Sequence, residues 1–158
     1  MGMWQDRLTL IVQQRLPRPK VVDIFRMPDL KSWEPGLVEV EFHPDEDFYS
    51  IGETLFGGYI AALADTYACH AVTTVLPDDL FVQTRSIQTY FHKPIRNEVV
   101  HIFGRLVWDG KRSAHARVEF TQNNGDLCVH AEAAIAKMPI PAGPKKTALN
   151  ANAQGNSN

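Results

Sequence analysis

Residues 52–76 read GETLFGGYIAALADTYACHAVTTVL, and this stretch decides the fold. Its paired glycines, Gly57 and Gly58, open a run of about five helical turns that Pro77 ends. At a helical spacing, one face collects small apolar side chains, and Asp65 falls in the middle of that face. The apolar members of the face are Ala61, Ala62, Ala68, Cys69 and Val72. The sequence therefore predicts a long central helix that carries a carboxylate on an apolar face.

Two interpretations of this helix are open from the residues alone. Asp65 is either a carboxylate tied to solvent or to a hydroxyl, or a group positioned for chemistry, and the surrounding alanines favour the second. The glycine pair is either a tight turn into a helix or a helix start whose bare N–H groups meet a substrate oxygen. The side chains that we expect to lie away from the apolar face are Tyr59, Thr66, Tyr67, His70 and Thr74.

Length and composition indicate one globular domain. The 158 residues can bury one proper core but not two ordinary ones. A net charge of −2 with scattered Lys and Arg speaks against a nucleic-acid-binding or membrane-surface protein. The start of the chain shows no secretory leader pattern, and no stretch is apolar enough to span a bilayer. Cys69 and Cys128 indicate free thiols in a reducing compartment, so we expect a cytoplasmic protein with no membrane or nucleic-acid partner.

The segment before the central helix divides into two parts. Apolar spacing predicts an amphipathic helix over residues 3–16 and an irregular stretch over residues 20–36. We expect residues 1–36 to pack on the domain as a helix and irregular arm. From Leu37 the apolar positions alternate, which predicts a half-buried strand up to His43.

Four further strands are predicted after the helix, over residues 81–93, 99–108, 111–121 and 127–137. Asp109-Gly110 and Asn124-Gly125 are hairpin signals between the last three. Strand, helix and four antiparallel strands predict an α+β fold with one helix on a curved sheet, over residues 37–138. We expect residues 139–158 to be a disordered tail. In the first of the four strands, the residues expected along one face are Thr84, Ser86, Gln88 and Tyr90.

Other candidate sites carry less weight. None of the six histidines has a second ligand at helical or hairpin spacing, and His115 and His130 are expected to point outward, so we expect no metal. Cys69 lies one turn beyond Asp65, but no cation near it in sequence would activate the thiol, and we interpret it as a small core residue. The corner Lys111-Arg112-Ser113 is either an exposed turn or a phosphate-binding site.

Several segments together resemble the hotdog-fold acyl-CoA thioesterases, and among them the phenylacetate-pathway branch. They are G-x-x-x-x-G-G before a long helix with a central Asp, then TRSIQTYFHKPI (residues 84–95) and WDGKRSAHA (residues 108–116). The resemblance implies a long helix wrapped by an antiparallel sheet, and an active site between two subunits. It further implies a homodimer or dimer of dimers, with coenzyme A as part of the substrate and no other cofactor.

Site residues carry over by position in the resemblance. Asp65 matches the catalytic carboxylate, which acts as nucleophile or as general base, and Gly57 matches the backbone N–H that holds the thioester carbonyl. Thr84 matches a hydroxyl that orients the attacking water and comes from the partner subunit. Gly58 belongs to the same glycine pair and is expected in the substrate site. Lys111, Arg112 and Ser113 match a region that meets the phosphates of coenzyme A.

Two substrate-site positions depart from the pattern of that family. Phe56 stands where its members usually have His, and Ser50 stands where many have Asn. These departures leave an alternative open, in which the chain binds acyl-CoA without efficient turnover. Hydration of an enoyl thioester is a third hypothesis, which is disfavoured because no His shares the helix face of Asp65. The acyl group, and coenzyme A or acyl carrier protein as its carrier, stay open.

Overall fold

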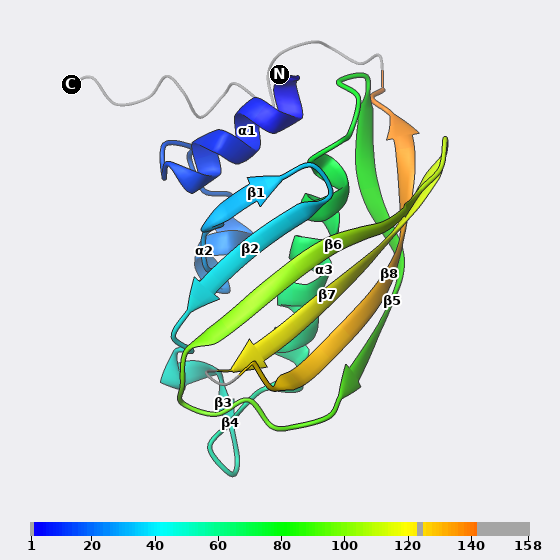
Figure 1. Cartoon of the computed structure of the whole chain (residues 1–158). Coiled ribbons are helices and arrows are strands. Elements are labelled where there is room, and N and C mark those ends of the chain that lie inside the picture. The colour runs from blue at the N-terminus through cyan, green and yellow to red at the C-terminus, as the bar shows by residue number, and fades with distance from the viewer. Residues whose placement is uncertain (1, 123–124, 142–158) are drawn as a thin grey trace, which may run out of the picture.

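The structure is a computed structural model that describes residues 2–122 and 125–141. The helices and strands form an α+β arrangement, as the sequence predicts (Figure 1). In chain order the elements are α1 (Met3–Val12), α2 (Lys20–Ile24), β1 (Ser32–Glu34), β2 (Leu37–Phe42), the 3-10 helix η1 (Glu46–Phe48), β3 (Tyr49–Ser50), β4 (Thr54–Leu55), α3 (Gly57–Thr73), β5 (Leu80–Phe91), β6 (Val100–Asp109), β7 (Ser113–Gln122) and β8 (Leu127–Pro139).

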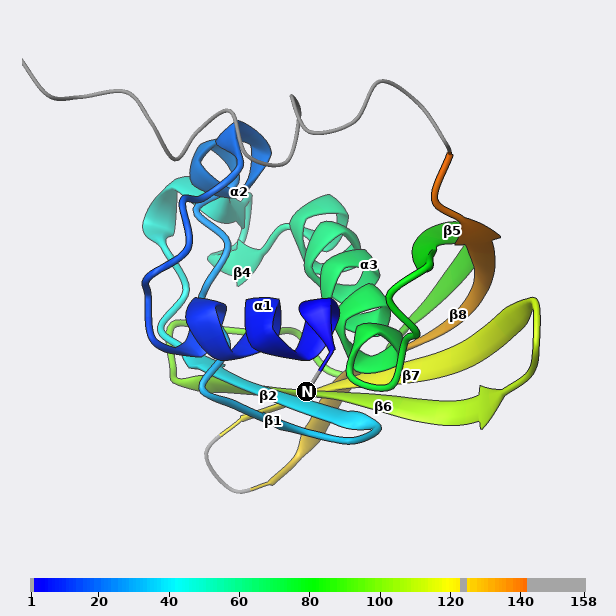
Figure 2. The ribbon, with the colours of Figure 1, turned by 90° about the horizontal axis from the view of Figure 1, so that it is seen from above.

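Six strands form one antiparallel sheet in the order β1-β2-β6-β7-β8-β5, and β3 pairs with β4 separately. The sheet curves around α3, with α1 on one side of this helix and β5 on the other (Figure 2). This arrangement confirms the hotdog architecture. β5 ends the sheet, so within the described residues it has a single strand neighbour, β8.

The core fills the space between α3 and the concave face of the sheet. Gly104 of β6 permits the closest approach of helix and sheet. A Cβ atom at that residue would lie 2.6 Å from the carbonyl oxygen of Tyr67 and 2.8 Å from Cγ2 of Val38. The side chains that α3 buries include Tyr59, Ile60, Leu63, Ala64, Tyr67, Ala68, Ala71 and Val72.

The buried face of α3 matches the face that the sequence predicts only in part. Tyr59 and Tyr67, expected to lie away from the apolar face, are 3% and 1% exposed, whereas Ala61 and Cys69 are only half-buried. The concave sheet leaves room for large rings, and the Tyr67 hydroxyl donates to the Pro28 carbonyl at 2.6 Å. A buried tyrosine with a satisfied hydroxyl contributes apolar area without an unpaired polar group. Ala68 and Val72 of the predicted face are fully buried, so the face of small side chains lies partly in the core and partly at its border.

β5 departs from simple alternation. The pairing of β5 with β8 shifts between Thr84 and Ser86, so that Arg85 is an extra residue in the strand. Thr84 consequently points toward α3, whereas Ser86 pairs with Ala134 on the outer face. The prediction that Thr84 and Ser86 share one face with Gln88 and Tyr90 is therefore wrong. By contrast, the predicted inward positions of β7 are all buried: Ala114, Ala116, Val118 and Phe120.

The N-terminal segment is more regular than predicted. The expected helix over residues 3–16 ends at Val12, and Gln14 then turns the chain with a left-handed φ of 54°. Residues 20–36 are not irregular, because they contain α2 and β1. The hydrogen bonds of β1 come from β2, a tertiary partner that local periodicity does not reveal. As predicted, the segment packs on the domain, and Trp4 Nε1 donates to the Leu80 carbonyl at 2.9 Å.

Of the two predicted hairpins, the structure describes the first completely and the second only in part. β6 and β7 form a hairpin, in which Asp109 pairs with Ala114 and the N–H of Gly110 donates to the Ser113 carbonyl at 2.9 Å. Asn124 of the second turn lies outside the described residues, and so does most of the predicted tail, from residue 142 onward. The division of the chain at residue 37 stays a prediction.

Candidate active site

α3 begins with two backbone N–H groups that have no acceptor in the described part of the chain. Phe56 precedes the helix in an extended conformation, with φ −62° and ψ 128°, and its side chain provides no cap. Its carbonyl accepts hydrogen bonds from the N–H groups of Tyr59 and Ile60, which leaves those of Gly57 and Gly58 free. Free N–H groups at a helix start attract electron-rich oxygen atoms. The helix start is therefore suited to polarise a carbonyl group.

A cleft of about 370 Å³ adjoins this helix start. Ser50, Gly57, Ile60, Phe91 and Lys93 contribute to its wall, so the structure brings the predicted Ser50 and Gly57 together. A Cβ atom on Gly57 would lie 3.3 Å from Cζ of Phe91, which is tight for such a contact. A glycine at this position therefore keeps both the cleft and its N–H donor accessible.

Phe56 lies outside the wall of this cleft. Its side chain is 57% exposed, and its ring covers Gly58, where a Cβ atom would come within 2.5 Å of Phe56 Cε1. The aromatic ring that lines the cleft is Phe91 at the end of β5, which the sequence analysis does not single out. Only the pairing of β5 with β8 brings this ring to the start of α3, and helical or strand periodicity carries no signal for that contact.

Asp65 stands two turns along α3 on its half-buried side. Within residues 2–122 and 125–141, its carboxylate forms no hydrogen bond or ion pair. The sequence places Asp65 in the middle of an apolar face. In the structure its carboxylate lies at the border of the core, where it is accessible. Such a carboxylate is available to a substrate or to a water molecule.

Thr84 lies beside the same helix, one turn beyond Asp65. Its Oγ1 is 3.2 Å from Cys69 Sγ in the same chain. The resemblance instead assigns this hydroxyl to the partner subunit, and the bulge at Arg85 explains how Thr84 of the same chain reaches α3. Burial raises the pKa of the Cys69 thiol, against a smaller opposite effect of the hydrogen bond with Thr84. The thiol is therefore protonated at neutral pH, which agrees with its interpretation as a core residue and not a nucleophile.

The predicted site residues form two groups in one chain. Gly57 and Asp65 are eight residues apart in one helix, which separates them by about 12 Å along its axis. Reacting groups must approach within about 3.5 Å of the same centre. A single thioester therefore cannot meet the N–H of Gly57 and the carboxylate of Asp65 from the same chain.

The corner at Lys111, Arg112 and Ser113 belongs to the second group. Ser113 pairs with Ala136, which also pairs with Gln83, next to Thr84. Gly57 lies at the opposite end of β5, near Phe91. Lys111 and Arg112 are exposed, and the Arg112 carbonyl accepts from the N–H of Lys137 at 2.9 Å. Within the described residues neither side chain forms an ion pair or hydrogen bond, so both cations can meet a ligand at the Thr84 end of the sheet.

Metal-ligating side chains do not cluster in the part of the chain that the structure describes. No group of three or more His, Cys, Asp or Glu residues there could hold a metal ion. Nε2 of His92 lies 2.7 Å from Nδ1 of His130, but this pair has no third ligand among the described residues. None of the helices in the described residues is long and apolar enough to cross a membrane.

Comparison with known proteins adds independent findings. Residues 44–136 match the family described as "Acyl-CoA thioesterase N-terminal domain". A curated protein of Sulfurisphaera tokodaii that carries the provisional name esterase is 28% identical over 95 residues, which cover 60% of this chain and 70% of that protein.

Solved structures share the fold at low identity. A thioesterase family protein from Silicibacter pomeroyi has a TM-score of 0.74 and 16% identity, over 84% of this chain and 99% of the other. A protein from Ralstonia eutropha, described as related to phenylacetic acid degradation and provisionally as a thioesterase, has a TM-score of 0.72 and 20% identity, over 82% and 98%. These likenesses support the fold, and the family match covers more than half of the sequence. The chain therefore belongs to the acyl-CoA thioesterase family of the hotdog superfamily and is a thioester hydrolase.

Proposed function

We propose that the chain hydrolyses acyl-CoA or aryl-CoA esters in an active site that a second copy completes. The backbone N–H of Gly57 in one copy holds the thioester carbonyl oxygen, and the partner subunit's Asp65 acts on that ester. The observation that carries the proposal is the N–H group of Gly57 at the cleft, with the Asp65 carboxylate about 12 Å away on the same helix and both without a partner among the described residues. Within one chain the two groups cannot act on the same thioester, so each needs its counterpart from a second copy.

The chemistry of a thioester fits this pair of groups. Resonance stabilises a thioester carbonyl poorly, so that donors aimed at the developing oxyanion and one oriented carboxylate can be enough. The N–H groups at the start of α3 are fixed by the helix and need no reorganisation during the reaction. One such donor lowers the barrier by about 3 kcal/mol in comparable sites.

Asp65 can act in two ways, and both remain open. As a nucleophile, its carboxylate oxygen attacks the carbonyl carbon, the coenzyme A thiolate leaves, and water hydrolyses the resulting anhydride. As a general base, it takes a proton from water, which attacks the carbonyl carbon while coenzyme A leaves as the thiol. In either case we assign to the hydroxyl of Thr84 the orientation of the attacking water.

The assembly that this site requires is a homodimer or a dimer of dimers. β5 and β1 each have a single strand neighbour among the described residues, and the 12 residues of β5 offer a much longer hydrogen-bonding edge than the 3 of β1. An unpaired edge of this length is a template for a strand of another chain. A second copy joined here would bring the Gly57 end of one chain toward the Thr84 end of the other, because antiparallel strands run in opposite directions.

Substrate binding follows from the two ends of this composite site. Lys111, Arg112 and Ser113 supply charged and hydroxyl donors, which suit the phosphates of coenzyme A. Phe91 and Ile60 line the cleft beside Gly57, which favours an apolar medium-chain or aromatic acyl group over a short or polar one. No other cofactor is required by this chemistry.

A second candidate function is acyl-CoA binding without efficient hydrolysis of the thioester. Phe56 and Ser50 replace the His and Asn that related thioesterases usually carry, and this departure favours a protein that holds acyl-CoA without efficient hydrolysis. Thiol release from hexanoyl-CoA and phenylacetyl-CoA separates the two candidates. We expect the wild-type chain to release coenzyme A, and Asp65→Asn to be at least about a hundredfold slower with an unchanged unfolding temperature. Tight binding without release by the wild type would favour the second candidate.

A further inference from the structure

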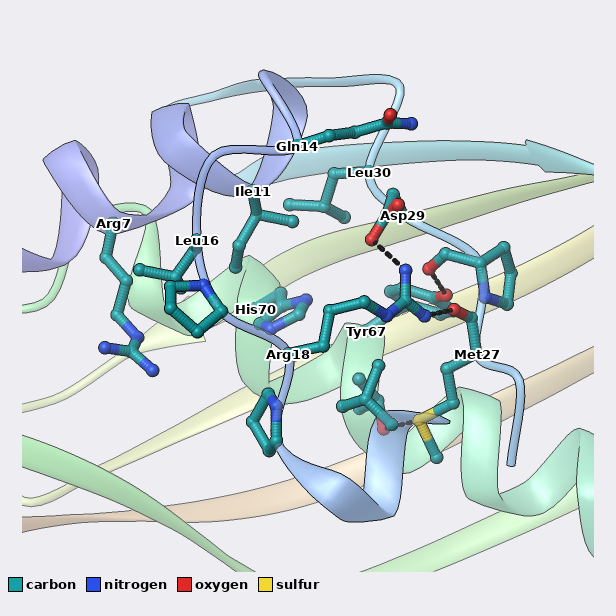
Figure 3. Close-up of a pocket in the computed structure, with 15 residues that line it drawn as sticks. Arg7, Ile11, Gln14, Leu16, Arg18, Met27, Asp29, Leu30, Tyr67 and His70 are labelled. Atoms are coloured by element: carbon teal, nitrogen blue, oxygen red, sulfur yellow. Dashed lines mark hydrogen bonds and ion pairs between the residues drawn. The ribbon is translucent and has the colours of Figure 1, made fainter. Parts of the chain in front are cut away.

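A second cavity lies on the other side of α3, beneath the N-terminal segment. It has a volume of about 370 Å³ and is enclosed by α1, residues 14–19, α2, residues 27–30 and α3 (Figure 3). We call it the arm cavity. Neither Gly57 nor Asp65 lines it, so it is distinct from the candidate active site.

Most of the arm cavity wall is apolar. Ile11, Leu16, Val22, Met27 and Leu30 surround the interior. The wall also contains the hydroxyls of Tyr67 and Thr66, and both already donate hydrogen bonds within the protein. Tyr67 donates to the Pro28 carbonyl at 2.6 Å, and Thr66 donates to the Ala62 carbonyl at 3.0 Å. An apolar pocket of this size with a few polar groups is typical of small-molecule sites.

Hydrogen bonds attach the N-terminal segment around the arm cavity to the rest of the domain. Gln5 Nε2 donates to the carbonyl of Thr74 at 3.0 Å, and Trp4 Nε1 donates to that of Leu80 at 2.9 Å. Met27 is fixed from the opposite side, because its carbonyl accepts a hydrogen bond from Arg18. These hydrogen bonds tie α1 to the end of α3 and to β5, and they tie Met27 to Arg18, so the segments around the cavity are fixed by named contacts.

The charges at the two sides of the arm cavity differ. At one side, Arg18 contacts both Asp23 and Asp29, at 3.0 Å and 2.7 Å, so that two carboxylates face one guanidinium. Arg7 stands at the other side (Figure 3), half-buried, and its guanidinium forms no ion pair or hydrogen bond within the described residues. An anion entering the cavity is therefore attracted toward Arg7 and repelled from the Arg18 side.

His70 adds a neutral polar group next to Arg7. Its Nδ1 atom is buried and has no hydrogen-bond partner in the described part of the chain. Burial, together with the charge of Arg7, lowers the pKa of His70 to about 4, so that the ring is neutral at physiological pH. A buried polar atom without a partner is unusual in a folded protein, and a bound ligand is one way to satisfy it.

A neighbouring hollow shares part of the arm cavity wall. Arg7, Ile11 and His70 line this hollow of about 320 Å³, which reaches Cys69, one helical turn from Asp65. Arg7 and His70 thus border both the arm cavity and a hollow on the side of α3 where hydrolysis is proposed.

We propose that the arm cavity binds an apolar monocarboxylate, with its carboxylate on Arg7 beside His70 and its apolar part among Ile11, Leu16 and Leu30. Medium-chain and monocyclic aromatic acids have the right chemistry. That this ligand is the acid released by the enzyme itself rests on the proposed function, whereas the binding site does not.

Calorimetric titration of the full chain with hexanoate and phenylacetate tests the site. We expect saturable binding that Arg7→Gln weakens by at least about tenfold, and that Arg7→Lys largely retains. Arg15→Gln is the matched control, because it removes the same charge from an exposed residue outside the cavity wall, and it should change Kd by less than about twofold. Hexan-1-ol, which has the apolar part without the charge, should bind equally to the wild type and Arg7→Gln.

Three results would overturn the proposal. These are no saturable binding to the wild type, equal losses in Arg7→Gln and Arg15→Gln, or a stronger loss in Gly57→Pro than in Arg7→Gln, which would locate the acid in the catalytic cleft. Coenzyme A release by Arg7→Gln should stay within about threefold of the wild type. If the wild type releases no coenzyme A but binds the acids through Arg7, the proposed function fails and the arm site stands.

Discussion

Gly57→Pro removes one hydrogen-bond donor and adds a ring whose Cβ contact with Phe91 the variant Gly57→Ala reproduces. Proline has no backbone N–H, and it is well tolerated at the first position of a helix, where that group has no partner within the helix. Gly57 is the first residue of α3, and Phe56 before it already has the extended conformation that a residue preceding proline requires, with φ −62° and ψ 128°. The substitution therefore tests the N–H donor itself.

The size of the effect follows from the proposed contact. If the N–H of Gly57 stabilises the oxyanion, its loss should lower kcat by about 100-fold to 1,000-fold, or roughly 3 to 4 kcal/mol. Gly57→Ala is the control, since its Cβ makes the same 3.3 Å contact with Phe91 Cζ while the N–H remains. We expect Gly57→Ala to stay within about tenfold of the wild type.

The assay is steady-state thiol release from phenylacetyl-CoA and hexanoyl-CoA, with the unfolding temperature of each variant measured in parallel. A folded Gly57→Pro variant that is as active as Gly57→Ala would refute the assignment of this N–H group. The carbonyl would then be held elsewhere, and the cleft beside Phe91 would lose its catalytic interpretation.

Other parts of the account predict further results. Gly104→Ala should lower the free energy of unfolding by about 1 to 3 kcal/mol, because its Cβ would lie 2.6 Å from the Tyr67 carbonyl oxygen; urea denaturation with unchanged stability would contradict this. The folded chain holds the pKa of His70 at about 4, below its usual 6.5, so the unfolded chain binds the extra proton first as pH falls and stability declines between these values. Between pH 7 and pH 4.5 the free energy of unfolding of His70→Gln should therefore fall by about 2 to 3 kcal/mol less than that of the wild type. Equal falls in both proteins would exclude protonation of His70 as the cause. Phe56→His should change kcat/KM on the best acyl-CoA by no more than about tenfold, since the ring of Phe56 covers Gly58 outside the cleft wall; an inert wild type with a strongly active variant would favour the acyl-CoA-binding alternative.

The features that the sequence predicts well depend on local patterns. The glycine pair, the length of the central helix and the alternation of β7 follow from short-range rules, and the structure agrees with each. The order of one helix followed by four strands is enough to indicate the sheet that wraps it. Asp65 is conspicuous because a carboxylate among alanines has no local explanation.

The features that escape prediction depend on tertiary contacts. The extra residue Arg85 turns Thr84 toward α3, and a period-two pattern cannot register such a shift. Phe91 lies beside Gly57 although 34 residues separate them in the chain, a contact that no local pattern indicates. The burial of Tyr67 depends on the Pro28 carbonyl, which lies 39 residues away in the chain. For the same reason the arm cavity, which combines five separate segments, has no signature in the sequence.

Complementation between two inactive variants tests the central claim most directly. Asp65→Asn and Gly57→Pro chains carrying different affinity tags are produced together, and mixed oligomers are purified through both tags. If one site combines Gly57 of one copy with the partner subunit's Asp65, one of the two sites in a mixed dimer is intact, and about half of the wild-type thiol release should return. Mixed oligomers no more active than the two separate variants would contradict a site shared between copies.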